Sequence, residues 1–237
     1  MTAPPARPSV PAAADPPAPE LPAPPNLRRI FNDLRGRLDA GHWWPADTDF
    51  EIIAGAVLTQ NTAWTNVERA LANLRAASLL DPATLVKADR EEVATAIRPS
   101  GFFRTKTDYL LAATAWFLSH GRAAEELPTD QLRTQLLTIR GVGEETADDI
   151  LLYVYHRPVF IYDAYARRLL EAEGLGVFKT YRQAKRALDP LVAESDFSAA
   201  ELALFHGLIV EDGKRRRRAT PAKRPRPRRA VSAGASA

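Results

Sequence analysis

The sequence predicts an all-α protein, and three observations lead to this fold class. Apolar residues recur at three- and four-residue intervals along most of residues 27–213, the spacing of one face of a helix. Asp, Ser or Thr stands before several of these runs, in the position of a helix cap. The strand-like run Val159 to Tyr162 is too short to build a sheet.

The first half of the chain illustrates these signals. Residues 1–26 are rich in Pro and Ala, with few large apolar groups, and we interpret them as a disordered extension. Two apolar stripes at helical spacing follow: Ile30, Leu34 and Leu38, then Val67, Leu71 and Leu74. Asp81 before Pro82, and Asp89 with Glu92, predict two helix starts. A further apolar face, Tyr109 to Phe117, is expected to stop at His120-Gly121.

The second half predicts a helical hairpin and one last helix. Thr129-Asp130 begins a helix with an apolar face of Leu132, Leu136 and Ile139, and a second helix is expected over Ala147 to Val154. The hairpin thus occupies residues 129–156, with the turn Gly141-Val142-Gly143 between its helices. Ser198 is expected to cap a final helix that runs to Ile209. Residues 214–237 are basic and interrupted by Pro, and we interpret them as a disordered tail.

Charge and composition limit the class of protein. Hydrophobic residues make up 46% of the 237 residues and charged residues 26%, as in soluble globular proteins. Ten of the 32 Lys and Arg residues lie from Lys214 onward, where Asp and Glu are absent, so the preceding part is net negative. Affinity for a polyanion would therefore depend on local patches, backbone dipoles and the basic tail.

Cysteine is absent, which excludes disulfides, thiolate chemistry and a four-cysteine iron–sulfur cluster. The first 26 residues contain no apolar core of signal-peptide length, and no segment has the length and apolarity of a membrane span. We therefore expect a cytoplasmic protein that does not interact with a membrane.

The Gly-Val-Gly turn and one downstream acid indicate a function. Glycine has no Cβ, so a phosphate can approach the backbone N–H groups of Gly141, Val142 and Gly143 at the start of the next helix. About twenty residues later, Asp163 ends an extended apolar run. A phosphate-binding turn followed by one acid suggests an enzyme that holds a DNA backbone and breaks a bond nearby.

These residues resemble the helix-hairpin-helix, Gly/Pro-Asp DNA glycosylases, the superfamily of endonuclease III. The resemblance spans residues 27–213, from Leu58-Thr59-Gln60-Asn61-Thr62 through the hairpin and Asp163 to Phe205-His206-Gly207. It implies a two-lobed helical glycosylase domain between the two tails. Many members carry an iron–sulfur cluster after the His-Gly helix, but this chain has no ligands for one, which points to a cluster-free branch.

The resemblance assigns catalysis to Asp163. Hydrolysis of an N-glycosidic bond develops positive charge on the deoxyribose, which a carboxylate stabilises while it orients or deprotonates the attacking water. Asp163 is also well placed to cap a helix that starts at Ala164, and both roles are compatible.

Glu145 occupies the hairpin position at which bifunctional endonuclease III-like enzymes have a lysine. That lysine attacks the sugar as an amine and forms a Schiff base, whereas a carboxylate forms no imine. The chain therefore resembles a monofunctional enzyme that uses water and leaves the abasic site uncut. Lys106 does not match the family position.

A Trp-Trp-Pro sequence resembles the DNA-3-methyladenine glycosylase III branch, in which aromatic residues enclose the flipped base. Here Trp43, Trp44 and Pro45 are followed by Gln60, Asn61 and Trp64, and Lys214 falls near that branch's pocket mouth. Cationic alkylated purines are attracted to indole faces. Packing between lobes is the alternative role for these tryptophans. The branch also has a lysine directly after its His-Gly, where this chain has Leu208.

Two further expectations concern DNA contacts. Gln60, with Asn61 beside it, is expected to probe the duplex by filling the hole left by the flipped base; satisfying local backbone groups is its alternative role. Thr146 is a candidate for a phosphate contact through its hydroxyl, and the carbonyl groups of the hairpin turn are candidates for a monovalent cation. For His206 a structural role is expected.

The sequence thus predicts a monomeric, monofunctional DNA glycosylase that excises an alkylated purine such as 3-methyladenine from double-stranded DNA. Neither a metal nor an organic cofactor is expected. Three alternatives stay open: a bifunctional endonuclease III-like glycosylase and lyase for damaged pyrimidines, a mismatch-specific thymine or uracil glycosylase, and a non-catalytic DNA-binding module.

Overall fold

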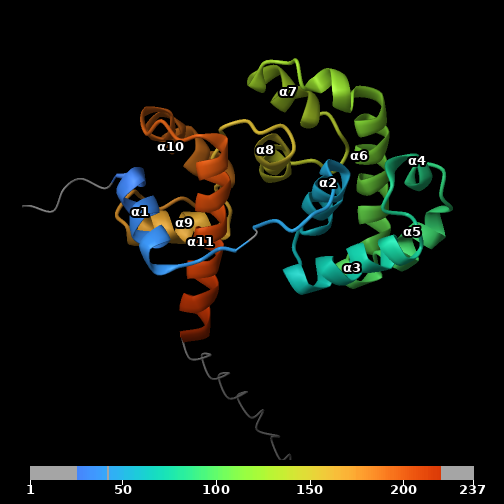
Figure 1. Ribbon diagram of the computed structural model, residues 1–237, viewed down its shortest axis with the longest axis horizontal. Helices are drawn as coiled ribbons and strands as arrows, with labels where there is room; N and C mark the ends of the chain where they lie inside the picture. The colour runs from blue at the N-terminus through green and yellow to red at the C-terminus, as the bar shows by residue number, and fades with distance from the viewer. Residues whose placement is uncertain (1–25, 42, 220–237) are drawn as a thin grey trace, which may run out of the picture.

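The computed structural model describes residues 26–41 and 43–219, and this part of the chain is helical throughout (Figure 1). Its described residues form eleven α-helices and one short 3-10 turn, and contain no strand. The predicted all-α class is confirmed, and Val159 to Tyr162 is an extended connection. Among these helices none is both long and apolar enough to cross a membrane.

The first helix and the last three form one lobe, at the left of Figure 1. It consists of α1 (Leu27–Arg37), α9 (Ala164–Ala172), α10 (Tyr181–Glu194) and α11 (Ala199–Ala219). Phe31 of α1 lies edge-on to Phe197 and Phe205, with ring centroids 5.6 and 5.4 Å away. The two ends of the described chain therefore pack into one core.

The other lobe is built around α2, whose residues are nearly all buried. Its members are α2 (Asp49–Leu58), α3 (Trp64–Ala76), α4 (Pro82–Leu85), α5 (Arg90–Ala96), the 3-10 turn η1 (Arg98–Ser100), α6 (Phe103–Ala124) and α7 (Thr129–Leu136). Asp81 and Asp89 accept hydrogen bonds from the first turns of α4 and α5, which confirms both predicted helix starts.

Helix α8 (Glu144–Tyr153) lies between the lobes and contacts α2, α7, α10 and α11. Its fully buried Asp148 accepts hydrogen bonds from Arg133 Nε and the Tyr181 hydroxyl, both at 2.7 Å, and lies 3.2 Å from Lys185 Nζ. A buried carboxylate needs such partners to offset its lost hydration. This cluster ties the hairpin helix to α7 and α10.

Three predicted boundaries were wrong. Helix α6 runs through His120-Gly121 to Ala124, because Gly121 keeps helical geometry, packs against Phe117, and accepts a hydrogen bond from the Tyr155 hydroxyl at 3.2 Å.

Helix α11 is capped by Ser198 as predicted, but it continues to Ala219, so the first residues of the expected tail are helical. Arginines in the last turn of α11 favour this extension, because they face the negative end of the helix dipole. Helix α8 also begins earlier than expected, at Glu144. The predicted disorder of residues 1–25 and 220–237 lies outside the described residues.

Candidate functional site

The turn between α7 and α8 depends on two glycines that act differently. Gly141 has φ +87°, and a Cβ there would lie 2.0 Å from the Tyr109 ring. Gly143 caps α8 with extended geometry, is exposed, and has open space around the position of a Cβ. The amide of Val142 donates to the Ile139 carbonyl at 3.0 Å. The exposed start of α8 therefore lies at Gly143 and the residues after it, whereas the Val142 amide is engaged within the turn.

Gln60 connects the end of α2 to this turn. Its Nε2 atom donates to the Gly141 carbonyl at 2.9 Å and to the Thr146 hydroxyl at 3.1 Å. Thr146 is buried, so in this arrangement its hydroxyl serves the Gln60 contact. Gln60 thus satisfies the hydrogen-bonding groups of two residues that are distant in sequence. The monovalent cation expected at this turn stays a prediction.

Asn61 follows Gln60 in the left-handed region, at φ +54°, and is exposed. Asn adopts this conformation more readily than most residues. Asn61 therefore projects from the same inter-helix connection as Gln60.

Asp163 lies at the start of α9 and is partly exposed. Its Oδ1 atom accepts a hydrogen bond from the Ala166 amide at 2.7 Å, which confirms the predicted cap. The side chain retains 14% of its accessible surface, and Oδ2 lies 4.0 Å from His206 Nε2. One carboxylate oxygen is fixed by the helix, and the other faces His206.

A chain of hydrogen bonds fixes His206. Trp43 Nε1 donates to the Tyr153 hydroxyl at 2.9 Å, and that hydroxyl lies 2.7 Å from His206 Nδ1. The Tyr153 hydroxyl thus joins the two rings, and Nε2 is the His206 nitrogen that lies toward Asp163. Burial raises the pKa of Tyr153 well above its usual value, so the hydroxyl keeps its proton.

The predicted aromatic residues gather beside this chain. Trp44 is buried, with its ring centroid 4.8 Å from Tyr153 and 5.5 Å from Trp64. Trp43 and Trp64 are half-buried, and Pro45 is exposed. The structure thus brings the three tryptophans together, with Trp44 packed behind the other two.

Gly207 and Lys214 lie on α11 beside Trp43. A Cβ on Gly207 would lie 2.6 Å from Trp43 Cγ, so the ring packs directly on the helix backbone. Lys214 Nζ lies 5.4 Å from the centre of the Trp43 ring and 2.7 Å from Glu211. Lys214 therefore lies close to one of the predicted aromatic residues, as expected.

Glu145 is exposed near the start of α8. Partial desolvation of its carboxyl group and the Asp163 carboxylate raise the pKa of Glu145, while His206 and Arg167 act in the opposite direction. The Glu145 carboxyl group therefore interacts with Asp163. Lys106, in contrast, is buried and donates at 2.8 Å to the carbonyls of Leu58 and Ser100, and burial lowers its pKa to about 8.

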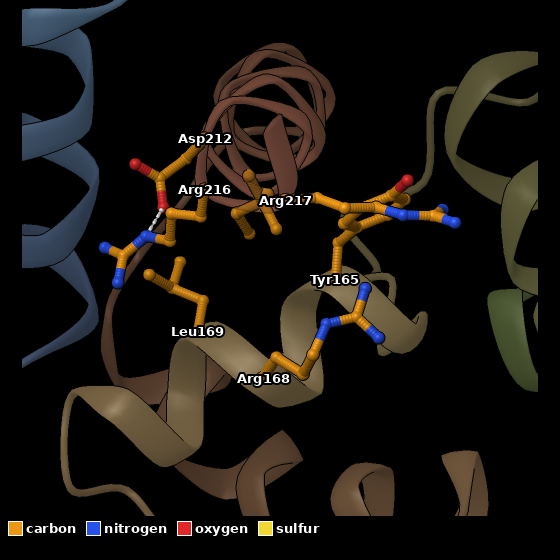
Figure 2. Close-up of a pocket in the computed structure, with 8 residues that line it drawn as sticks. Tyr165, Arg168, Leu169, Asp212, Arg216 and Arg217 are labelled. Atoms are coloured by element: carbon orange, nitrogen blue, oxygen red, sulfur yellow. Dashed lines mark hydrogen bonds and ion pairs between the residues drawn. The ribbon is translucent and has the colours of Figure 1, made fainter. Parts of the chain in front are cut away.

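A groove of about 390 Å³, not predicted from the sequence, lies between α9 and α11. Figure 2 shows Arg168 and Arg217 on the side of Tyr165, and Arg216 turned toward Asp212 on the other side. Arg168 stacks over the Tyr165 ring at 4.8 Å, and Tyr165 packs against Gly213. The spacing of Tyr165 and Arg168 on one face of a helix was the available signal.

Comparisons with known proteins agree with this arrangement. Residues 54–194 match the HhH-GPD superfamily of base excision DNA repair proteins. A Methanocaldococcus jannaschii protein, provisionally named as the DNA repair glycosylase MJ1434, is 39% identical over 195 residues, covering 80% of this chain and 87% of its own. Endonuclease III of Thermotoga maritima is 27% identical, over 80% of this chain and 83% of its own.

A solved structure extends the likeness. The H. pylori 3-methyladenine DNA glycosylase MagIII, bound to 1,N6-ethenoadenine, superposes with a TM-score of 0.69 and 28% identity, over 81% of this chain and 98% of that one. The hairpin, Asp163 and the His-Gly helix thus occur within a shared fold. The chain belongs to the HhH-GPD superfamily of base excision DNA repair proteins.

Proposed function

We propose that this protein is a monofunctional DNA glycosylase that excises alkylated purines. Asp163 carries the proposal, because its partly exposed carboxylate has one oxygen fixed by the Ala166 amide and the other directed at His206. In this role Asp163 stabilises the positive charge that develops on the sugar and accepts a proton from the attacking water. The fixed orientation keeps the carboxylate in place before the substrate arrives.

The base pocket is assigned to Trp43, Trp44, Pro45, Trp64 and Lys214. Trp43 and Trp64 are half-buried, so part of each indole surface is available for stacking, and Trp44 supports them from behind. An indole face attracts a positively charged purine such as 3-methyladenine or 7-methylguanine. The structurally similar MagIII, which holds ethenoadenine, makes neutral modified purines a second group of candidate substrates.

Water is the proposed nucleophile. Glu145 stands where a bifunctional enzyme would present an amine, and the lysine discussed above, Lys106, is 2% exposed and bound to two carbonyls. Neither group is suited to attack the sugar and form a Schiff base. The product is therefore an abasic site in an uncut strand.

We assign binding of the DNA backbone to the start of α8 and to the groove between α9 and α11. The exposed Gly143 permits a phosphate to approach the first-turn amides of α8. Arg168 and Arg217 place positive charge in the groove between α9 and α11, where a neighbouring phosphate could bind. Asn61 projects from the loop beside the hairpin, whereas Gln60 lies against the hairpin turn, and we assign both to probing the duplex once DNA is bound.

The test is a set of duplexes with one defined lesion each: 7-methylguanine, ethenoadenine, an oxidised pyrimidine, or a mismatched thymine. Released base is scored directly, and strand cleavage is scored with and without alkali. Release of the purine lesions, with cleavage only after alkali, is the expected result. Release of the oxidised pyrimidine with cleavage in the absence of alkali would refute the proposal.

A further inference from the structure

Asp149 is a buried carboxyl group with no part in the proposed water attack or DNA grip. It is 4% exposed, its Oδ1 atom is fully enclosed, and it forms no hydrogen bond with any residue in the described part of the chain. Most buried polar atoms in proteins have a partner. An orphaned acid beside a substrate site therefore suggests that the partner arrives with the substrate.

Asp149 lies on the face of α8 that borders the site. Glu145, Asp149 and Tyr153 are spaced by four residues and share that face. Glu145 interacts with Asp163 at one end, and Tyr153 bonds Trp43 and His206 at the other. Asp148, one residue earlier, turns instead toward α10 and is fully partnered. Asp149 thus lies between the catalytic carboxylate and the aromatic residues.

Its surroundings favour the neutral form of Asp149. Burial raises its pKa well above the usual value, and the negative charges of Glu145, Asp163 and Asp148 act in the same direction. The titratable groups that face it are Glu145, Asp148 and Tyr153 on α8, Asp163 on α9, and Tyr181 on α10. A carboxylic acid held neutral has a proton to donate.

We propose that Asp149 hydrogen-bonds the flipped base and protonates it as it leaves, which extends excision from cationic to neutral purines. This inference rests on the proposed function and adds a general acid to it. Asp163 then acts on the sugar and the attacking water, and Asp149 acts on the base.

When a neutral purine leaves, the C1′–N9 bond breaks, its electron pair goes to the base, and the Asp149 proton moves to a ring nitrogen of that base. Water bonds to C1′ and gives one proton to Asp163. After the base departs, Asp163 loses that proton to solvent and Asp149 regains one. A 7-methylguanine base leaves without this proton because it already carries a positive charge.

The Asp149→Asn variant tests the proposal, because asparagine has the same shape and donates a hydrogen bond but transfers no proton. Single-turnover release is measured for ethenoadenine and 7-methylguanine. We expect a loss of about 10²-fold on ethenoadenine and less than about 3-fold on 7-methylguanine. Wild-type release of ethenoadenine should also fall as the pH rises through the raised Asp149 pKa, and the variant should lack this decline.

Asp148→Asn is the matched control. It removes a neighbouring buried carboxylate that faces α10, so it should lower the unfolding temperature and change the ratio of the two release rates far less than Asp149→Asn does. Equal losses on both bases in Asp149→Asn, no loss on either, or a wild-type enzyme that releases only 7-methylguanine would overturn the inference. A wild-type protein that releases neither base would instead refute the proposed function itself.

Discussion

The Nε2 atom of His206 lies 4.0 Å from the Oδ2 atom of Asp163, and the Tyr153 hydroxyl holds the other side of the same imidazole. This relationship joins α11 to the start of α9, and hydrogen bonds through the Tyr153 hydroxyl connect His206 to Trp43. The orientation of the proposed catalytic carboxylate and the position of the proposed base-stacking ring are therefore coupled.

Tyr153→Phe should slow base release without weakening DNA binding. The variant removes the hydroxyl that bonds His206 Nδ1 and accepts from Trp43 Nε1, so both rings lose their fixed orientation. We expect base release to slow by roughly tenfold, with stability lowered by about 1 kcal/mol from the unpaired groups. Single-turnover kinetics and DNA affinity measured in parallel check this, and an unchanged release rate would contradict it.

Glu145→Lys should convert the protein toward lyase chemistry. An amine placed beside Asp163 has the position from which bifunctional relatives attack the sugar. Borohydride should trap a covalent protein–DNA adduct with this variant and none with the wild type or with Glu145→Gln. An adduct with the wild type would disprove the monofunctional mechanism.

Gly207→Ala should displace Trp43. The new Cβ would meet the indole at 2.6 Å, and the large ring is the group that has to move. We expect release of 7-methylguanine to fall by about 10-fold or more while affinity for an undamaged duplex stays constant. Gly36→Ala, at an α1 site with nothing within 4 Å, is the control and should retain full activity.

Arg168→Ala combined with Arg217→Ala should weaken the electrostatic part of DNA binding. Each lost phosphate contact reduces the slope of log affinity against log salt by about 1, so the double variant should lose about 2. Arg35→Ala, an exposed arginine on α1, should leave the slope unchanged. Identical slopes in the wild type and the double variant would exclude the groove from the DNA interface.

Local signals in the sequence were enough for much of the fold and part of the site. Caps at Asp81, Asp89 and Ser198 and the glycine turn depend on neighbouring residues, so they can be recognised in a single sequence. Contacts between distant elements cannot be recognised in this way. Gly121 resembles a helix stop in the sequence but lies within α6. Its carbonyl accepts a hydrogen bond from the Tyr155 hydroxyl.

The site residues also fall into those that the sequence predicts and those that only contacts between distant elements reveal. Asp163 was predicted from its position after the hairpin, whereas Gln60 was assigned to the DNA and contacts the hairpin in this structure. Asp149 was missed, although an acid four residues from Glu145 and four from Tyr153 was visible in the sequence. Its importance comes from burial without a partner, which depends on helices packed from distant parts of the chain.

The central claim, that the Asp163 carboxylate drives base release, is tested most directly by Asp163→Asn in single-turnover assays on a 7-methylguanine duplex. The amide retains an oxygen to cap α9 but loses the negative charge, so release should fall by about 10²-fold or more with DNA affinity unchanged. Asp33→Asn, on the exposed face of α1, should behave as the wild type. Wild-type release rates in a folded Asp163→Asn protein would contradict the account.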